Sequence, residues 1–243
     1  MLYNMNFPFI CPNNYDVPRV DLHIHTIYTD GSNTINEILQ KAMLMNIETI
    51  AITDHVWKTS TYLDQYFDEI KTKRESIALK VLAGIEAKII NINGDIDATP
   101  DVIDESEIVL GSLHSIPTDE DYAFLDVNRT EADEVINNSF EALINLIESK
   151  RVDVVAHPTA LLKKYGYNFN TEQMEEIASK AAKYNVAIEI NTKYKVPSLK
   201  FIKICVNKGV LFSLGSDAHT LKEIGNINYA YISKIFNGMR NTV

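Results

Sequence analysis

Residues 48–55 read ETIAITDH, an apolar run that ends in a carboxylate and an imidazole. The run lacks the polar–apolar alternation of a half-exposed strand. Continuous apolar runs of this kind are typical of parallel strands that helices cover. Similar runs recur as VDVVA at 152–156 and VLFSLG at 210–215, so the sequence predicts an α/β fold with a parallel sheet.

Strand-like runs and longer helical patterns alternate along the whole chain. We expect strands at 19–25, 48–53, 80–86, 107–113, 152–156, 186–191 and 210–215. We expect helices at 35–46, 61–78, 131–149, 171–184, 197–208 and 227–238. Strands joined by such crossovers predict a closed or nearly closed TIM-like barrel. In such a barrel, side chains at the C-terminal strand ends meet at one mouth.

Two connecting segments depart from this alternation. Residues 91–106 are irregular, and Asn93-Gly94 predicts a tight turn between two short strands. The acidic loop 115–130 is long enough to form a rim or a lid over the mouth.

The helix expected at 171–184 opens with Thr171 and carries glutamates in its first turn, as the helix dipole favours.

The composition is that of a globular domain with a full apolar core: 46% of the residues are hydrophobic and 23% are charged. No apolar run is long enough to predict a membrane span. Residues 1–18 contain no Lys or Arg, unlike a secretory signal, and we expect a short arm beside a single domain of residues 1–243. Cys11 and Cys205 lie outside the motifs and predict free thiols in a reducing cytoplasm.

The net charge of −10 restricts the class of ligand. A general nucleic-acid-binding protein would show a basic stripe. Divalent ions bound at one mouth would nevertheless make the local field positive there. The balance favours a small anionic substrate over a long polyanion.

All six histidines lie at or just after predicted strand ends, and carboxylates accompany them. Imidazoles and carboxylates that converge at one mouth are the ligands of a multinuclear site for divalent metals. The candidate metal ligands are His23, His25, Asp30, His55, Glu86, His114, His157, Asp217 and His219.

Spacing supports several of these assignments. His23 and His25 alternate on one strand, so both side chains point to the same face and can hold a single ion. Asp217 and His219 repeat this spacing with one carboxylate and one imidazole. Asp30, in a TDG turn, is either a ligand or only a turn-forming residue.

The remaining candidates are either metal ligands or residues that hold the ligands in place. Glu86 is the only carboxylate that ends the third strand, and bridging two ions would satisfy both of its oxygens. His55 is either a ligand or a buried histidine bonded by its neighbour Asp54. We expect Asp21, Asp54 and Asp153 to accept from metal-bound histidines or to be structural carboxylates.

A few basic residues are candidates for binding substrate. Lys193, just after the sixth strand, and Arg129 and Lys163, on rim loops, either contact a phosphate or are simply solvated. Trp57 either lines the pocket or packs. The sequence contains no Ser-His-Asp or Cys-His nucleophile set and no Gly-rich phosphate loop.

With these motifs in place, the chain resembles the PHP (polymerase and histidinol phosphatase) family, in its branch of stand-alone phosphoesterases. The resemblance runs from residue 19 to about residue 225 and rests on DLHIHT with TDG, ITDH, GIE, His114, AHP and GSDAH, in that order. It implies a distorted seven-stranded α/β barrel with up to three divalent ions, commonly zinc, manganese or iron.

The resemblance also implies how three ions would share the ligands. The first would be held by His23, His25, Glu86 and Asp217, the second by Glu86, His114 and His157, and the third by Asp30, His55 and His219. Glu86, Asp217 and His219 are the expected catalytic residues, with Asp217 or a water moving the proton. Some relatives have His at the position of Asp30, so this ligand varies within the family.

We therefore expect a metal-dependent phosphatase that hydrolyses small phosphomonoesters with an activated water. The alternatives are a histidinol phosphatase specifically, or a phosphodiesterase or exonuclease acting on single-stranded nucleic-acid ends. A third is a metal-bound regulatory module without catalysis. Loss of ligands would mark that module, and all nine positions here hold competent residues. Amidohydrolases use similar barrels, but they usually need a strand-end lysine, which is absent here.

Overall fold

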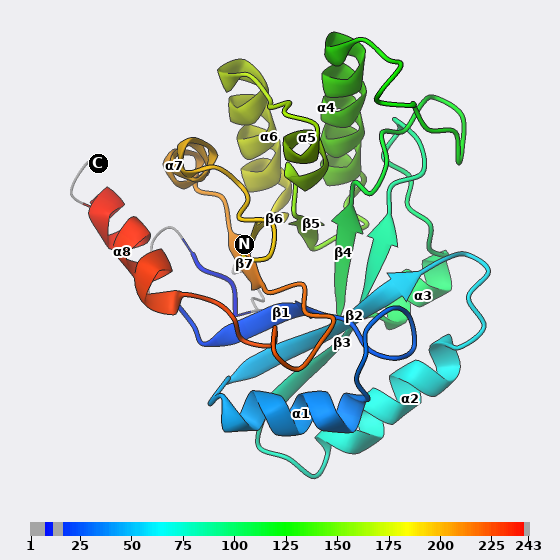
Figure 1. Cartoon of the computed structure of the whole chain (residues 1–243), viewed down its shortest axis with the longest axis vertical. Coiled ribbons are helices and arrows are strands. Elements are labelled where there is room, and N and C mark those ends of the chain that lie inside the picture. The colour runs from blue at the N-terminus through cyan, green and yellow to red at the C-terminus, as the bar shows by residue number, and fades with distance from the viewer. Residues whose placement is uncertain (1–7, 12–16, 241–243) are drawn as a thin grey trace.

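A computed structural model of the chain describes residues 8–11 and 17–240. Seven parallel strands form one sheet in chain order (Figure 1). The strands are β1 Val20–Ile24, β2 Thr49–Val56, β3 Lys80–Lys88, β4 Ile108–Ser112, β5 Val154–Ala156, β6 Ala187–Asn191 and β7 Phe212–Gly215. All seven predicted strands are therefore confirmed, with small shifts at their ends.

Helices cover the outside of the sheet, with α1 and α2 below it and α4 and α6 above it in the view of Figure 1. The helices are α1 Ile35–Leu44, α2 Leu63–Arg74, α3 Pro100–Glu105, α4 Ala132–Ser149, α5 Ala160–Lys164, α6 Thr171–Tyr184, α7 Leu199–Lys208 and α8 Tyr229–Arg240. The six predicted helices are confirmed, whereas α3 and α5 were not predicted. Both are too short to display a helical period of apolar residues.

The barrel nearly closes between its first and last strands. Beyond the end of β7, Ala218 forms a parallel bridge with Ile24 of β1. The amide of His25 donates to the carbonyl of Ala218 at 2.9 Å, and the amide of Ala218 donates to the carbonyl of His23 at 3.2 Å. The predicted nearly closed barrel is confirmed, and closure takes place beside two candidate ligands.

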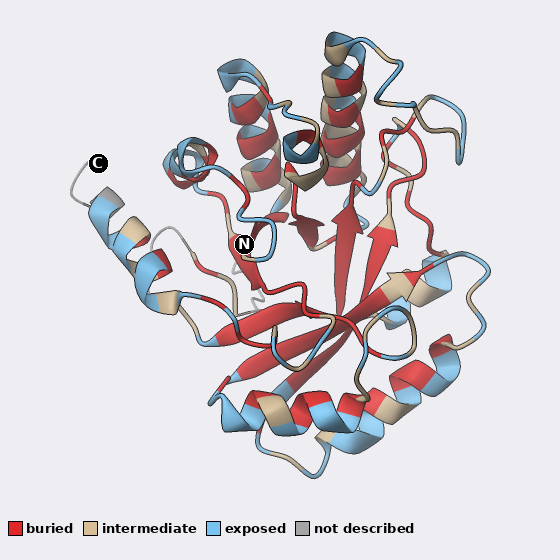
Figure 2. Cartoon of the chain, viewed as in Figure 1, coloured by how far each residue is buried: buried red, intermediate tan, exposed pale blue. Residues whose placement is uncertain are grey.

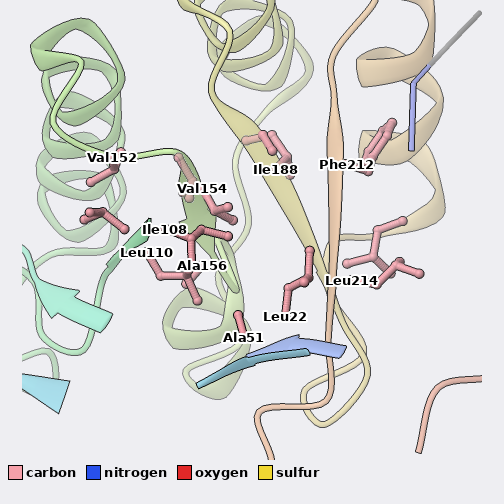
Figure 3. Close-up of a cluster of buried hydrophobic side chains, with 14 of the residues drawn as sticks. Leu22, Ala51, Ile108, Leu110, Val152, Val154, Ala156, Ile188, Phe212 and Leu214 are labelled. Carbon is pink, nitrogen blue, oxygen red and sulfur yellow. The ribbon is translucent and has the colours of Figure 1, made fainter. Parts of the chain in front are cut away.

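Apolar side chains fill the space between the strands and the helices. Figure 2 shows the strands buried and each of the long helices buried only along the side that faces the sheet. Leu22, Ile188 and Leu214, from β1, β6 and β7, are fully buried in the cluster drawn in Figure 3. Full burial of one such side chain contributes about 1.5–3 kcal/mol, which gives the strand ends a rigid support.

Helix ends follow local sequence signals, with one correction. The N-cap of α6 is Asn170, whose side chain accepts from the amide of Gln173, and Thr171 is the first helical residue. Asn and Thr are both common N-cap residues. Asn170 is the N-cap here because its backbone amide also donates to the side-chain oxygen of Gln173, which completes a capping box. Gly209 ends α7 with φ 76°, as expected for a left-handed C-terminal residue.

The irregular segment after β3 differs partly from the expectation. The Asn93-Gly94 turn is present, with the Gly94 amide donating to Asn91, but only one bridge, between Ile89 and Ile96, replaces the two short strands. The loop between β4 and α4 folds onto this segment through a hydrogen bond from Tyr122 to Asp97 at 2.8 Å. This loop is a rim of the barrel, and its role as a lid stays a prediction.

The described part of the N-terminal arm packs against the barrel. Ile10 is fully buried and forms an antiparallel bridge with Phe212 of β7. The rest of the arm, residues 1–7 and 12–16, lies outside the described residues. Both cysteines are free thiols, so no disulfide joins them. A search of the described residues finds no helix that is both long enough and apolar enough to cross a membrane.

Candidate metal centre

The C-terminal ends of six strands bring all nine candidate ligands together. Four groups of these side chains have ligand atoms within 4.8 Å of one another. The groups are His25, Asp30, His55 and His219; His23, His157 and Asp217; His23, His25 and Glu86; and His55, Glu86 and His114. The groups share members, so the arrangement is one continuous cluster.

Glu86 occupies the middle of this cluster. Its Oε1 lies 2.9 Å from His157 Nε2 and 3.1 Å from His114 Nε2. Its Oε2 lies 3.0 Å from His55 Nδ1, 3.4 Å from His23 Nε2 and 3.5 Å from His25 Nε2. The two oxygens therefore face different sets of imidazoles, which is the arrangement a carboxylate needs to bridge two ions.

Strand pairing explains why Glu86 meets His55. The two residues are partners in the parallel register of β2 and β3. The alternative reading of His55, a histidine bonded by Asp54, does not match the structure. Asp54 instead accepts from the amide and hydroxyl of Thr26 and from the hydroxyl of Thr29.

Asp30 reaches the outer part of the cluster from its turn. Its Oδ2 lies 3.2 Å from His219 Nε2 and 3.4 Å from His55 Nε2. Its side chain is 52% exposed, so this group is the most open to solvent of the four. The turn lies so close to the end of β1 that a Cβ on Gly31 would overlap the carbonyl of His25.

The inner part of the cluster divides its ligands differently from the family pattern. Asp217 groups with His23 and His157, although its Oδ1 also lies 3.6 Å from His25 Nε2. Both His157 and Asp217 have positive φ, 29° and 53°. Non-glycine residues in that region are strained, and such strain is concentrated at functional sites. The backbone turns here so that both side chains face the mouth.

The donor set fits divalent metal ions. His25 Nδ1 and His157 Nδ1 are buried and, among the described residues, have no hydrogen-bond partner. His23 Nε2 and His25 Nε2 lie 3.0 Å apart, so a cation must lie between their lone pairs or one nitrogen must carry a proton. Bonds of about 2.0–2.2 Å at tetrahedral angles separate ligand atoms by roughly 3.3–3.6 Å, close to several of the separations found here.

Electrostatics keep the central carboxylate ionised. Burial alone would raise the pKa of Glu86, but the imidazoles of His114 and His23 hold it well below its usual range. Burial, with His23 beside it, lowers the pKa of His25 well below its usual range. An ionised Glu86 and a neutral His25 are both in the form that binds a cation.

Glu189, in the middle of β6, is a site residue that the sequence analysis missed. Its Oε1 lies 2.8 Å from His23 Nδ1, and its Oε2 accepts from the amide of His157 at 2.6 Å. Because an ionised carboxylate only accepts hydrogen bonds, His23 Nδ1 carries a proton in this contact, and Nε2 is the ring atom that a metal ion would use. The signal in the sequence is a carboxylate inside the otherwise apolar strand AIEIN.

Of the two roles expected for Asp21, Asp54 and Asp153, acceptors from histidine or structural carboxylates, the structure matches the structural one. Asp21 accepts from Ser216 and Gly225, at 2.9 and 2.8 Å from their amides. Asp153 accepts from the amide of Val109 at 2.8 Å. These bonds tie neighbouring strands together and leave the support of His23 to Glu189.

A cavity of about 610 Å³ adjoins the cluster. Its lining includes the candidate ligands His114 and His157, and also Lys193. Lys193 Nζ donates to the carbonyl of Asp217 at 3.1 Å and lies 3.3 Å from its carboxylate. Lys193 is therefore close enough to the candidate ligands to contact a phosphate bound there.

Arg129 and Trp57, unlike Lys193, are not among the residues that line this cavity. Arg129 is 86% exposed and pairs with Asp126 at 3.4 Å. Trp57 is 45% exposed, with its ring 6.2 Å from the ring of His55. Lys163 does line the cavity, and its ammonium donates to the carbonyls of Tyr194 and Lys195.

Comparison with known proteins identifies relatives of this chain. The PHP domain profile matches residues 21–193. A protein named Probable phosphatase from Shewanella piezotolerans is 32% identical, covering 87% of this chain and 82% of its own length. The DNA polymerase/3'-5' exonuclease PolX of Bacillus subtilis is 27% identical, covering 85% of this chain but 35% of its own length.

Among solved structures, the fold is similar to that of histidinol phosphate phosphatase from Lactococcus lactis, which was crystallised with zinc, L-histidinol and phosphate. The TM-score is 0.70 at 19% identity, covering 91% of this chain and 93% of that one. The profile match spans the strands that carry most of the candidate ligands. The chain belongs to the PHP domain family.

Proposed function

We propose that this protein is a metal-dependent phosphoesterase that hydrolyses small phosphomonoesters. The observation that carries the proposal is Glu86, a buried carboxylate whose two oxygens face five imidazoles beside a lysine-lined cavity. The Shewanella relative, named Probable phosphatase, supports the same reaction class. We propose His23, His25, Asp30, His55, Glu86, His114, His157, Asp217 and His219 as the ligands of up to three divalent ions, of zinc, manganese or iron.

The residues of the chain divide the work of the reaction. Bound divalent ions supply a hydroxide nucleophile at neutral pH and neutralise charge on the phosphoryl group. Asp217, whose carboxylate lies 3.3 Å from the ammonium of Lys193, is the group we assign to accept and pass on a proton. Lys193 is placed to contact a phosphoryl oxygen, and His219 lies 3.0 Å from its ammonium.

Hydrolysis of phosphomonoesters by metal-loaded protein tests the proposal. We expect a screen of about a hundred metabolites, with histidinol phosphate as the first candidate, to identify small phosphomonoesters that are cleaved. Elemental analysis of the same protein should find two to three transition-metal ions per chain. Less than one ion per chain after reconstitution contradicts the multinuclear site, and bound metal without any hydrolysis favours a regulatory module.

The nucleic-acid alternative makes an opposite prediction about salt. Each phosphate contact in a nuclease groove adds close to one unit to the salt slope of binding. With a net charge of −10, we expect kcat/KM for small esters to depend only weakly on salt and single-stranded DNA to be cut slowly. Efficient trimming of oligonucleotides with steep inhibition by salt contradicts our proposal. The cytoplasmic location expected from the free thiols stays a prediction.

A further inference from the structure

The cavity beside the metal centre has a charge opposite to that of the whole chain. Lysine supplies three of its lining residues, Lys163, Lys164 and Lys193, and none of its lining residues is Asp or Glu. The chain as a whole carries ten more acidic than basic residues. Lys193 faces the carboxylate of Asp217, but Lys163 and Lys164 have no carboxylate partner among the described residues, and such a pair of lysines attracts an anion.

One of these lysines is already close to the metal centre, whereas the other two come from a different element. Lys193 Nζ contacts the carboxylate of Asp217, so its position suits the phosphoryl group that is cleaved. Lys163 and Lys164 lie on the last turn of α5, which follows the His157 strand. Their positive charge is therefore available to a part of the substrate other than the reacting phosphate.

The wall that carries these lysines is fixed in place. Lys163 Nζ donates to the carbonyl of Tyr194 at 2.7 Å and to that of Lys195 at 3.2 Å, which ties α5 to the loop after β6. The ring of Tyr194 lies edge-on to that of His157, with centroids 5.5 Å apart. Lys164 is exposed and forms no ion pair with any described residue. Its ammonium lies 5.6 Å from the centre of the Tyr165 ring, a contact that leaves its charge accessible to a ligand.

We propose that this cavity binds the alcohol part of the substrate and selects a second anionic group, a carboxylate or a second phosphate. This inference rests on the proposed phosphoesterase function, because it assigns the reacting phosphate to the metal centre. The floor of Leu113, Ala160 and Leu161 accepts a short carbon chain between the two anionic groups. Histidinol phosphate, the first compound of the proposed screen, would bring an ammonium close to these lysines, so this inference predicts that it is a poorer substrate than an ester with a second anionic group.

Phosphonates that cannot be hydrolysed test the selection independently of catalysis. We expect metal-loaded protein to bind 3-phosphonopropionate and propane-1,3-bisphosphonate more tightly than propylphosphonate, and 3-aminopropylphosphonate most weakly, in isothermal calorimetry. The first two ligands separate carboxylate from phosphate as the preferred second group. If 3-phosphonopropionate and propane-1,3-bisphosphonate bind no more tightly than propylphosphonate, the inference is overturned.

Lys164→Gln locates the effect. Because an exposed charge pair contributes about 0.2–1 kcal/mol, the variant should lower the affinity ratio of 3-phosphonopropionate to propylphosphonate by about 1.4-fold to fivefold. Lys164→Glu should lower it further and improve binding of 3-aminopropylphosphonate. The matched control is Lys203→Gln, an exposed lysine of α7 that does not line the cavity. An unchanged ratio in both Lys164 variants overturns the inference.

The same proteins distinguish this inference from the proposed function. If the ratios behave as expected but no phosphomonoester is cleaved, the subsite stands and the phosphoesterase function fails. If phosphomonoesters are cleaved but 3-phosphoglycerate is no better a substrate than glycerol 3-phosphate, the function stands and the anion selection is wrong.

Discussion

Replacing Glu189 by Gln should weaken metal binding without unfolding the barrel. The carboxylate accepts from His23 Nδ1 on one oxygen and from the amide of His157 on the other. Glutamine has only one oxygen to offer these two donors. Its amide nitrogen must face one of them, which leaves a donor opposite a donor inside the protein.

The structure indicates the size of the effect. A buried donor without an acceptor costs about 1–3 kcal/mol. If the glutamine oxygen serves His157, its amide group favours the tautomer of His23 that carries a proton on Nε2. That proton must be moved before Nε2 can bind a metal. Because 1.4 kcal/mol corresponds to tenfold, we expect a loss of metal affinity of about 10- to 100-fold.

Competition against a chelator of known affinity measures this loss, and circular dichroism checks that the fold remains. Asp153→Asn is the matched control, because Asp153 accepts from a backbone amide and contacts no imidazole. The control should cost some stability while leaving metal affinity unchanged. Wild-type affinity in Glu189→Gln, or an equal loss in the control, would refute the role assigned to Glu189.

Four further outcomes are expected. Glu86→Gln should abolish hydrolysis and lower the metal content, and turnover at the wild-type rate would make Glu86 only structural. Lys193→Ala should raise KM more than it lowers kcat, if Lys193 holds phosphate equally in the ground and transition states; unchanged kinetics would return it to a solvated lysine. Removing the metal with a chelator should lower the melting temperature, since ligands that bind only the folded state stabilise it. Tyr66→Phe should destabilise the protein by about 1–3 kcal/mol in urea titrations, because Tyr66 is buried and its hydroxyl lies 2.9 Å from the carbonyl of Ile52 and 2.8 Å from that of Gly84.

The strands and the candidate ligands could be predicted because their signals are local. An apolar run followed at once by an imidazole, as in ITDH or VDVVAHP, reports both a buried strand and its C-terminal end. Parallel strands then bring all such ends to one mouth without any knowledge of the loops. Asp30 was also found in this way, because its turn follows β1 directly.

Other features depend on tertiary contacts and could not be predicted in the same way. α3 has signals, a Thr99 cap and Pro100 at its first position, but a helix of this length has no period to detect. The grouping of Asp217 with His157 depends on how β5 and β7 approach across the mouth. The supporting role of Glu189 rather than Asp153 depends on which strand faces His23.

Gly215 shows how the fold and the candidate metal centre depend on the same contacts. A Cβ on Gly215 would overlap Glu189 Oε1 and lie 2.7 Å from the Cβ of His23. The absence of a side chain on β7 therefore lets the carboxylate of β6 reach the imidazole of β1. This reach crosses the place where the barrel closes, next to the bridge between Ile24 and Ala218. The hydrogen bond that orients His23 thus also links β6 to β1. A substitution that removes this hydrogen bond should therefore weaken both metal binding and the contact that closes the barrel.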